Sequence, residues 1–119
     1  MYVQGFLIPV PEDKKQAYIE MATRFSDLFK SYGCTEIVEA WEDNVTDGKV
    51  TDFRMAVKAE PGEKIVFSWM IWPDRATCDA AHEKMESDPA FAESMSDMPF
   101  DGKRMIWGGF TPVMTLGRN

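Results

Sequence analysis

The stretch from Lys64 to Trp72 constrains the fold of this chain more than any other. β-Branched and aromatic side chains fill it, which is typical of a strand. Successive side chains of a strand point to opposite faces of the sheet. One face would carry Ile65, Phe67, Trp69 and Ile71, and the other would carry Val66, Met70 and Trp72. Both faces are apolar, so we expect a central strand whose sheet is covered on both sides.

Alternating patterns predict three further strands and a short arm. Nearly every residue from Tyr2 to Val10 is apolar, and residues 34–42 and 103–113 also alternate with a period of two. Two glycines, Gly108 and Gly109, interrupt the last strand, which usually marks a bulge or a close approach by another group. A brief alternation over residues 53–57 predicts an inserted β-hairpin arm.

Helical periodicity predicts two main helices. Asp13 and Gln16 resemble a capping box, and a continuous apolar stripe follows from Tyr18 to Tyr32. Gly33 fits the left-handed position that ends many helices. Asp74 is placed to cap the second helix. The stripe of this second helix contains Cys78, Ala81, His82 and Met85.

The order of these elements is strand, helix, strand, arm, strand, helix, strand. This order predicts an α+β fold, a ferredoxin-like split βαβ protomer with an antiparallel sheet and both main helices on one face. The 119 residues are expected to form a single domain, 1–119. Because the helices cover only one apolar face, we expect a second copy to cover the other face, sheet against sheet.

Composition and motifs exclude several functional classes. The formal net charge is -7, which disfavours the basic surface that nucleic-acid binding requires. The start of the chain has no basic n-region, and no apolar run reaches the roughly 20 residues of a membrane span. We therefore expect a cytoplasmic protein in which Cys34 and Cys78 are free thiols. No phosphate-binding glycine loop, dinucleotide fingerprint or zinc spacing is present, so we expect no cofactor and no metal.

Three blocks of sequence resemble the YbaA-like domain-of-unknown-function family. They are Gly48–Arg54, the pair Phe67–Trp69 and Trp72–Pro73, and Met98–Met105 with Gly108–Phe110. The resemblance covers almost the whole chain and implies a dimeric α+β barrel, in which the sheet of one ferredoxin-like protomer packs against that of its twin. It implies no activity, because the wider superfamily contains cofactor-independent monooxygenases, isomerases, haem-binding enzymes and proteins without known chemistry.

Two residues are candidates for catalysis. His82 is the only histidine, and it is a general-base or haem-ligand candidate with Asp79 placed to orient it. The alternative is a packing role on the helix. Glu39 has the parity of Ile37 and Trp41, so an internal face would leave its carboxylate either paired or with a raised pKa. Arg104 and Arg54 are its expected partners.

Four residues are candidates for ligand binding. Arg54 and Arg104 stand beside carboxylates and could clamp an anion at a pocket mouth. The alternative is that their ion pairs fix the arm and the dimer. Trp41 and Trp69 belong to an aromatic set on the strands that could line a small-molecule pocket. The alternative for these rings is a barrel core and dimer interface.

Three functions remain open from the sequence. The first is a homodimer that binds a small, largely apolar molecule between sheet and helices, with no catalysis or with cofactor-independent catalysis. The second is a structural or regulatory dimer without a ligand. The third is a haem-binding or monooxygenase-like barrel. The residues do not distinguish an enzyme from a binding protein.

Overall fold

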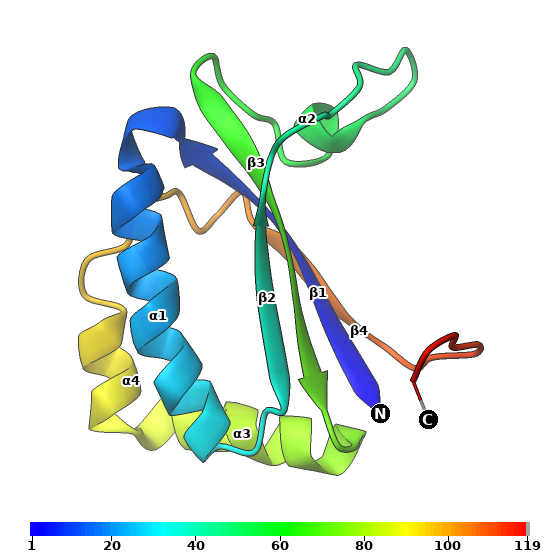
Figure 1. Ribbon diagram of the computed structural model, residues 1–119. Coiled ribbons are helices and arrows are strands. Elements are labelled where there is room, and N and C mark those ends of the chain that lie inside the picture. The colour runs from blue at the N-terminus through cyan, green and yellow to red at the C-terminus, as the bar shows by residue number, and fades with distance from the viewer. Residues whose placement is uncertain (119) are drawn as a thin grey trace.

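The computed structural model describes residues 1–118 of the chain (Figure 1). Its elements in chain order are β1 (Tyr2–Pro11), the 3₁₀ helix η1 (Glu12–Lys14), α1 (Lys15–Ser31), β2 (Glu36–Trp41), α2 (Phe53–Ala56), β3 (Glu63–Trp72), α3 (Arg75–Ser87), α4 (Pro89–Ser94) and β4 (Ile106–Phe110). The four strands form one sheet in the order β2-β3-β1-β4, and each neighbouring pair is antiparallel. The predicted α+β, ferredoxin-like arrangement is confirmed, with β3 inside the sheet.

The helices α1, α3 and α4 lie on one side of the sheet (Figure 1). Within residues 1–118 the other side meets only the short helix α2 at one end, where the Phe53 ring packs on Phe67 with centroids 6.2 Å apart. The strand register decides which residues face the helices. Gln4 pairs with Met70, and Glu39 pairs with Ser68, so these four side chains point toward the helices. Val38 pairs with Trp69 on the opposite face.

Both main helices end or begin where the sequence indicates. Gly33 has a φ of 107°, and a Cβ at this position would lie 2.8 Å from Thr77 Cγ2 of α3. Asp74 is the N-cap of α3, because its Oδ1 accepts hydrogen bonds from the backbone N–H and the hydroxyl of Thr77, both at 2.7 Å. The left-handed glycine therefore also permits close packing of the end of α1 on the start of α3.

The start of α1 differs from the expected capping box. Lys14 occupies the N-cap position and makes no side-chain cap bond. The chain leaves β1 through the 3₁₀ turn η1, and the N–H of Glu12 donates to the carbonyl of Gly62 at 2.9 Å. This turn places Asp13 ahead of α1, so the capping-box prediction is wrong.

The segment between β2 and β3 contains a helix, and the predicted β arm at residues 53–57 is wrong. Asp52 caps α2, since its Oδ1 accepts from the N–H of Met55 at 2.7 Å. Its Oδ2 accepts from the N–H of Gly48 at 2.9 Å, which holds the preceding loop in place. Three alternating apolar residues fit one helical turn as readily as a strand, and the cap favours the helix.

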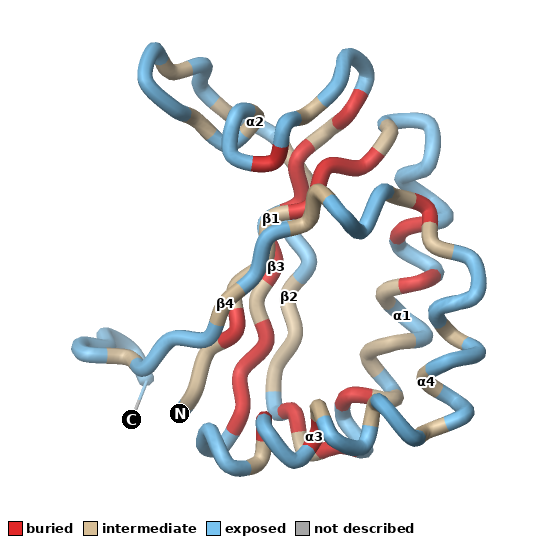
Figure 2. The backbone as a smooth tube through the Cα atoms, turned by 180° about the vertical axis from the view of Figure 1, so that it is seen from behind, coloured by how far each residue is buried: buried red, intermediate tan, exposed pale blue. Residues whose placement is uncertain are grey.

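The core lies between the sheet and the helices. Figure 2 shows buried residues along β1 and β3 and on the inward side of α1 and α3. Trp72 and Val10 have no exposed surface, and Tyr18 of α1 is 2% exposed. Cys34 and Cys78 are buried free thiols, as expected. None of the helices in residues 1–118 combines the length and the apolar character that crossing a membrane requires.

Candidate functional site

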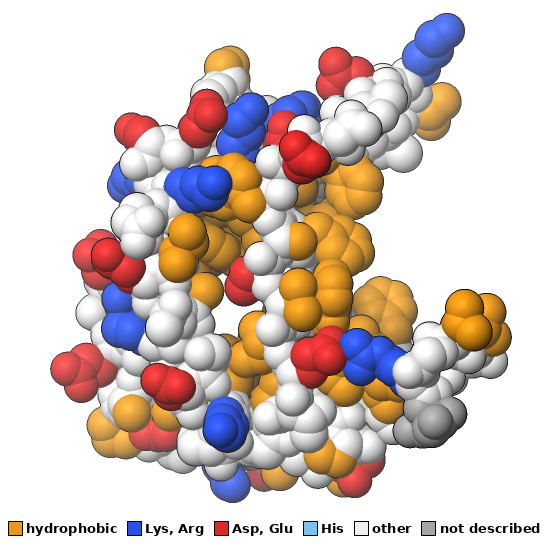
Figure 3. All heavy atoms as spheres, in the orientation of Figure 1, with side chains coloured by type: hydrophobic (Ala, Val, Ile, Leu, Met, Phe, Trp, Pro, Cys, Tyr) orange, Lys and Arg blue, Asp and Glu red, His pale blue; other side chains and the backbone are white. Residues whose placement is uncertain are grey.

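A cavity of about 170 Å³ lies between the sheet and helices α1 and α4. Figure 3 shows a hollow between α1 and β2 with hydrophobic side chains on its walls. The walls are mostly aromatic and methionine side chains: Phe6, Phe25, Phe29, Phe91 and Phe100, with Met21, Met70, Met95, Met98 and Met105. Four lining residues carry polar groups, namely Tyr18 and Ser26 of α1, Glu39 of β2 and Ser68 of β3.

Glu39 reaches this cavity because β2 alternates. Its neighbour across the sheet is Ser68, and its parity matches that of Ile37 and Trp41. Tyr18 approaches from the first turns of α1, and its hydroxyl donates to the two Glu39 carboxylate oxygens at 3.2 and 3.0 Å. The Ser68 hydroxyl donates to Glu39 Oε1 at 3.0 Å. Three elements distant in sequence therefore converge on one carboxyl group.

Burial governs the protonation of this group. The residue as a whole is exposed at the open edge of β2, but its carboxyl end lies in the recess beneath α1. Burial raises the pKa of Glu39, against the opposing effect of the hydrogen bonds from Ser68 and Tyr18. Burial, together with the Glu39 charge, also raises the pKa of the Tyr18 hydroxyl, so this hydroxyl remains a donor.

A second hollow of about 320 Å³ opens between α1 and β2 and meets the cavity at Glu39. Trp41 and Lys15 stand at this mouth, with Lys15 Nζ 5.3 Å from the centre of the Trp41 ring. Trp69 lies on the opposite face of the sheet, where its Nε1–H donates to Glu36 at 2.9 Å. The structure thus brings Trp41 to the Glu39 site and separates Trp69 from it.

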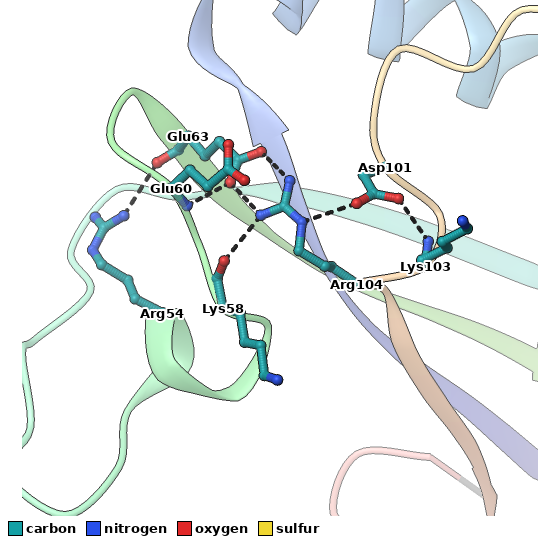
Figure 4. Close-up of polar contacts among 7 residues, drawn as sticks. All are labelled: Arg54, Lys58, Glu60, Glu63, Asp101, Lys103 and Arg104. Carbon is teal, nitrogen blue, oxygen red and sulfur yellow. Dashed lines mark hydrogen bonds and ion pairs between the residues drawn. The ribbon is translucent and has the colours of Figure 1, made fainter.

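The expected pairing of Glu39 with Arg104 and Arg54 is wrong, because both guanidinium groups bind other carboxylates near the start of β3. Figure 4 shows Arg104 against the Glu63 carboxylate and Arg54 against the Glu63 carbonyl. Arg104 makes two hydrogen bonds to Glu63, of 2.6 and 2.7 Å, and also donates to the carbonyl of Lys58 at 3.0 Å. Its proximity lowers the pKa of the Glu63 carboxyl.

Arg54 completes this network from α2. It donates to the carbonyl of Glu63 at 3.2 Å and forms an ion pair with Glu42, whose other oxygen accepts from the N–H of Ile65 at 2.9 Å. The two arginines therefore attach residues 43–62 and the turn before β4 to the start of β3. Arg54 belongs to the sequence block Gly48–Arg54, and Arg104 belongs to the block Met98–Met105.

His82 lies on α3, outside the walls of the cavity. Trp72 Nε1–H donates to Gln4 Oε1 at 2.8 Å, which turns the amide nitrogen of Gln4 toward His82 Nε2 at 2.9 Å. An amide nitrogen only donates, so His82 Nε2 accepts and Nδ1 carries the proton. The ring stacks on Trp107 with centroids 5.7 Å apart.

This geometry supports neither the general-base role nor the haem-ligand role of His82. Asp79, the residue expected to orient it, pairs with Arg75 at 3.5 Å. A haem iron at Nε2 would have to displace Gln4, which is 3% exposed and would lose its acceptor. Within residues 1–118, no group of three or more His, Cys, Asp or Glu side chains is arranged to hold a metal ion.

Tyr18 and Ser68 are the two site residues that the sequence did not indicate. Tyr18 belongs to the apolar stripe of α1, where its hydroxyl gives no separate signal. Ser68 is the one hydroxyl side chain inside the otherwise apolar run of β3, and it is 1% exposed. A buried hydroxyl requires a hydrogen-bond partner, so its position was a usable signal.

Comparison with known proteins places the chain among relatives of undetermined function. Residues 1–102 match the family described as "Protein of unknown function (DUF1428)". The uncharacterised protein YbaA of Escherichia coli strain K12 is 57% identical over 113 residues, which is 95% of this chain and 97% of YbaA. These matches confirm the resemblance that the three sequence blocks predicted.

Two solved structures share the fold. A dimeric ferredoxin-like protein from an uncultured marine organism superimposes with a TM-score of 0.64 at 9% identity, covering 99% of this chain and 100% of that one. An uncharacterised NIPSNAP domain protein from Burkholderia xenovorans gives a TM-score of 0.60 at 12% identity, with the same coverage of both chains. At these identities the likeness concerns the fold alone.

Proposed function

We propose that this chain, which belongs to the DUF1428 family, is a homodimer that binds a small, largely apolar molecule in the cavity beside Glu39. The cavity itself carries the proposal. Protein interiors pack densely and contain few voids larger than a water molecule. The cavity of about 170 Å³ meets the hollow of about 320 Å³ at Glu39. Apolar walls with a few convergent polar groups are the usual form of a small-molecule site.

The second copy is proposed for the sheet face opposite α1, α3 and α4. Phe67, Ile106 and Phe110 on this face are 48%, 45% and 60% exposed. Figure 3 shows hydrophobic side chains along it, between the segment with α2 and the C-terminal segment. Exposed apolar patches of this kind usually mark interaction surfaces. Two of the similar solved structures are described as dimeric ferredoxin-like proteins, which supports the same arrangement here.

The chemistry available in the cavity is acid–base chemistry at Glu39. A carboxyl group whose pKa is raised can accept or return a proton nearer neutral pH than an ordinary glutamate. Glu39 would contact the bound molecule in the same position whether the protein only binds it or also catalyses a cofactor-independent proton transfer. We also propose a cytoplasmic location, which the two free cysteines support.

Methionine methyl NMR tests ligand binding. Five of the nine methionines line the cavity, and Met1, Met55, Met85 and Met114 do not. Titration of ¹³C-methyl-labelled protein with 2-phenylethanol, a neutral aromatic probe, is expected to shift the lining methyl signals selectively. The variant Ala22→Leu fills the cavity wall and should abolish these shifts, whereas Ala80→Leu on the exposed side of α3 should not. Shifts absent from the lining methyls at millimolar probe would refute the binding proposal.

Light scattering tests the dimer. The wild-type chain is expected to show twice its mass of 13.6 kDa at micromolar concentration. Phe67→Asp places a charge in the middle of the apolar face and should yield the monomer, and the exposed change Ala80→Leu should leave the mass unchanged. A monomeric wild-type mass would overturn this part of the proposal.

A further inference from the structure

The Glu39 carboxylate has no positively charged partner in the cavity. None of the ion pairs among the described residues includes Glu39. The described walls of the cavity contain no Lys or Arg. The cation at the mouth, Lys15, lies with its ammonium group over the Trp41 ring. An ionised Glu39 would therefore have neutral hydrogen-bond donors, Tyr18 and Ser68, but no counter-charge for a carboxyl end held in the recess beneath α1, which is unfavourable.

The hydrogen bonds around Glu39 leave room for one more donor. An ionised carboxylate offers about four acceptor positions. The hydroxyl of Tyr18 and the hydroxyl of Ser68 together make three contacts with its two oxygens. Both hydroxyls are neutral donors, one from α1 and the other from β3. The remaining acceptor capacity is open to a group inside the cavity.

The aromatic walls favour a cation over an anion. Tyr18 packs on Phe100 with ring centroids 5.8 Å apart, and both rings line the cavity. The faces of aromatic rings carry partial negative charge and attract ammonium groups. The Glu39 carboxylate and the ring faces thus both attract a cation, and both would repel a bound anion.

We infer that the cavity takes a small apolar amine, with its ammonium group against Glu39 and its hydrocarbon body among the phenylalanine and methionine side chains. This assignment rests on the proposed binding function and adds the ligand class. The ammonium group supplies the missing counter-charge, and Tyr18 and Ser68 hold the carboxylate toward it. The methionine side chains are flexible, so the walls can adjust to hydrocarbon bodies of differing shape.

Three probes of nearly equal size separate charge from shape: 2-phenylethylamine, 2-phenylethanol and phenylacetate. At pH 7 the amine is expected to bind at least about tenfold more tightly than the alcohol, because a charged hydrogen bond is stronger than a neutral one. Phenylacetate should bind most weakly. Affinities are read from the shifts of the five lining methionine methyls.

Matched variants locate the preference. Glu39→Gln should reduce the amine-to-alcohol ratio to within about threefold while the alcohol still binds, because the amide keeps the shape but loses the charge. Glu20→Gln removes the same charge from the exposed surface of α1 and should retain the wild-type ratio.

Each other outcome has a distinct meaning. Equal binding of alcohol and amine by the wild type would overturn the amine assignment and leave the binding function standing. If none of the three probes shifts the lining methyl signals, both the amine assignment and the binding function are overturned. An amine that shifts Met1 and Met114 alone would place binding on the opposite sheet face, where those residues lie, and would also overturn the assignment.

Discussion

Replacing Gln4 tests the hydrogen-bonded chain that connects the sheet to α3. Gln4 accepts from Trp72 Nε1–H at 2.8 Å and donates to His82 Nε2 at 2.9 Å. Gln4→Leu keeps similar bulk but removes both functions. Trp72 is fully buried, so its N–H would have no acceptor, whereas His82 is only half-buried and can bond to water.

The expected loss follows from these two environments. A buried donor left without a partner costs about 1–3 kcal/mol, and a group that regains water costs little. Gln4→Leu should therefore lower the free energy of unfolding by about 2 kcal/mol. In the background Trp72→Phe the donor is absent, so the same substitution should cost about 1 kcal/mol less, although Trp72→Phe alone is destabilising because it leaves a cavity.

Urea unfolding followed by circular dichroism measures all four members of this cycle. Protomer concentration is held constant, because association contributes to apparent stability. His82→Phe serves as the control, since it leaves the bond from Trp72 to Gln4 intact and should cost less than Gln4→Leu. If the effects of Gln4→Leu and Trp72→Phe add to within about 0.3–0.5 kcal/mol, the two side chains are not coupled and the reasoning fails.

Three further expectations concern pH and packing. Because the pKa of Glu39 is raised above 4.5, Glu39→Gln should gain stability relative to the wild type as pH rises from 4.5 through the folded pKa, which pH-dependent urea unfolding measures. Arg104 lowers the pKa of Glu63, so Arg104→Gln should reduce the urea midpoint at pH 7 relative to the wild type. This difference should shrink below pH 4.5, as Glu63 takes up a proton. An unchanged difference at pH 3 would contradict the reasoning. Gly109→Ala should cost about 1–3 kcal/mol in thermal or urea unfolding, because a Cβ there would lie 2.6 Å from Tyr2 Cζ, and Tyr2→Ala should remove most of that cost.

The strands were predictable because each carries a strong local signal. The apolar run of β3 required cover on both faces, and the structure places it inside the sheet. The predictions failed where a single local contact, from a side chain or from the backbone, decides between two structures. At residues 53–57 the cap formed by Asp52 selects a helix, and at the start of α1 the turn after Pro11 displaces the expected cap.

The site was predictable only in part, for a related reason. Alternation along β2 identifies Glu39 as an inward carboxyl, because Ile37 and Trp41 share its parity. The apolar stripe of α1 turns Tyr18 toward the sheet. Which strand residues it meets depends on the register between β2 and β3 and on where α1 lies over the sheet, and neither has a periodic signal in the sequence. Tertiary structure thus brings Ser68 and Tyr18 to Glu39. Arg104 and Arg54 instead pair with Glu63 and Glu42.

The two faces of the sheet have separate roles in these proposals, and this separation can be tested. Glu39 and Ser68 point toward the helices, while Phe67 and Trp69 project from the opposite face. A change on one face should leave the property assigned to the other intact. Phe67→Asp should abolish the dimer without preventing the probe from shifting the lining methionines, and Ala22→Leu should block the probe without changing the mass. If Phe67→Asp instead abolishes both in a protein with native circular dichroism, the cavity depends on the dimer and the two roles are coupled through the sheet.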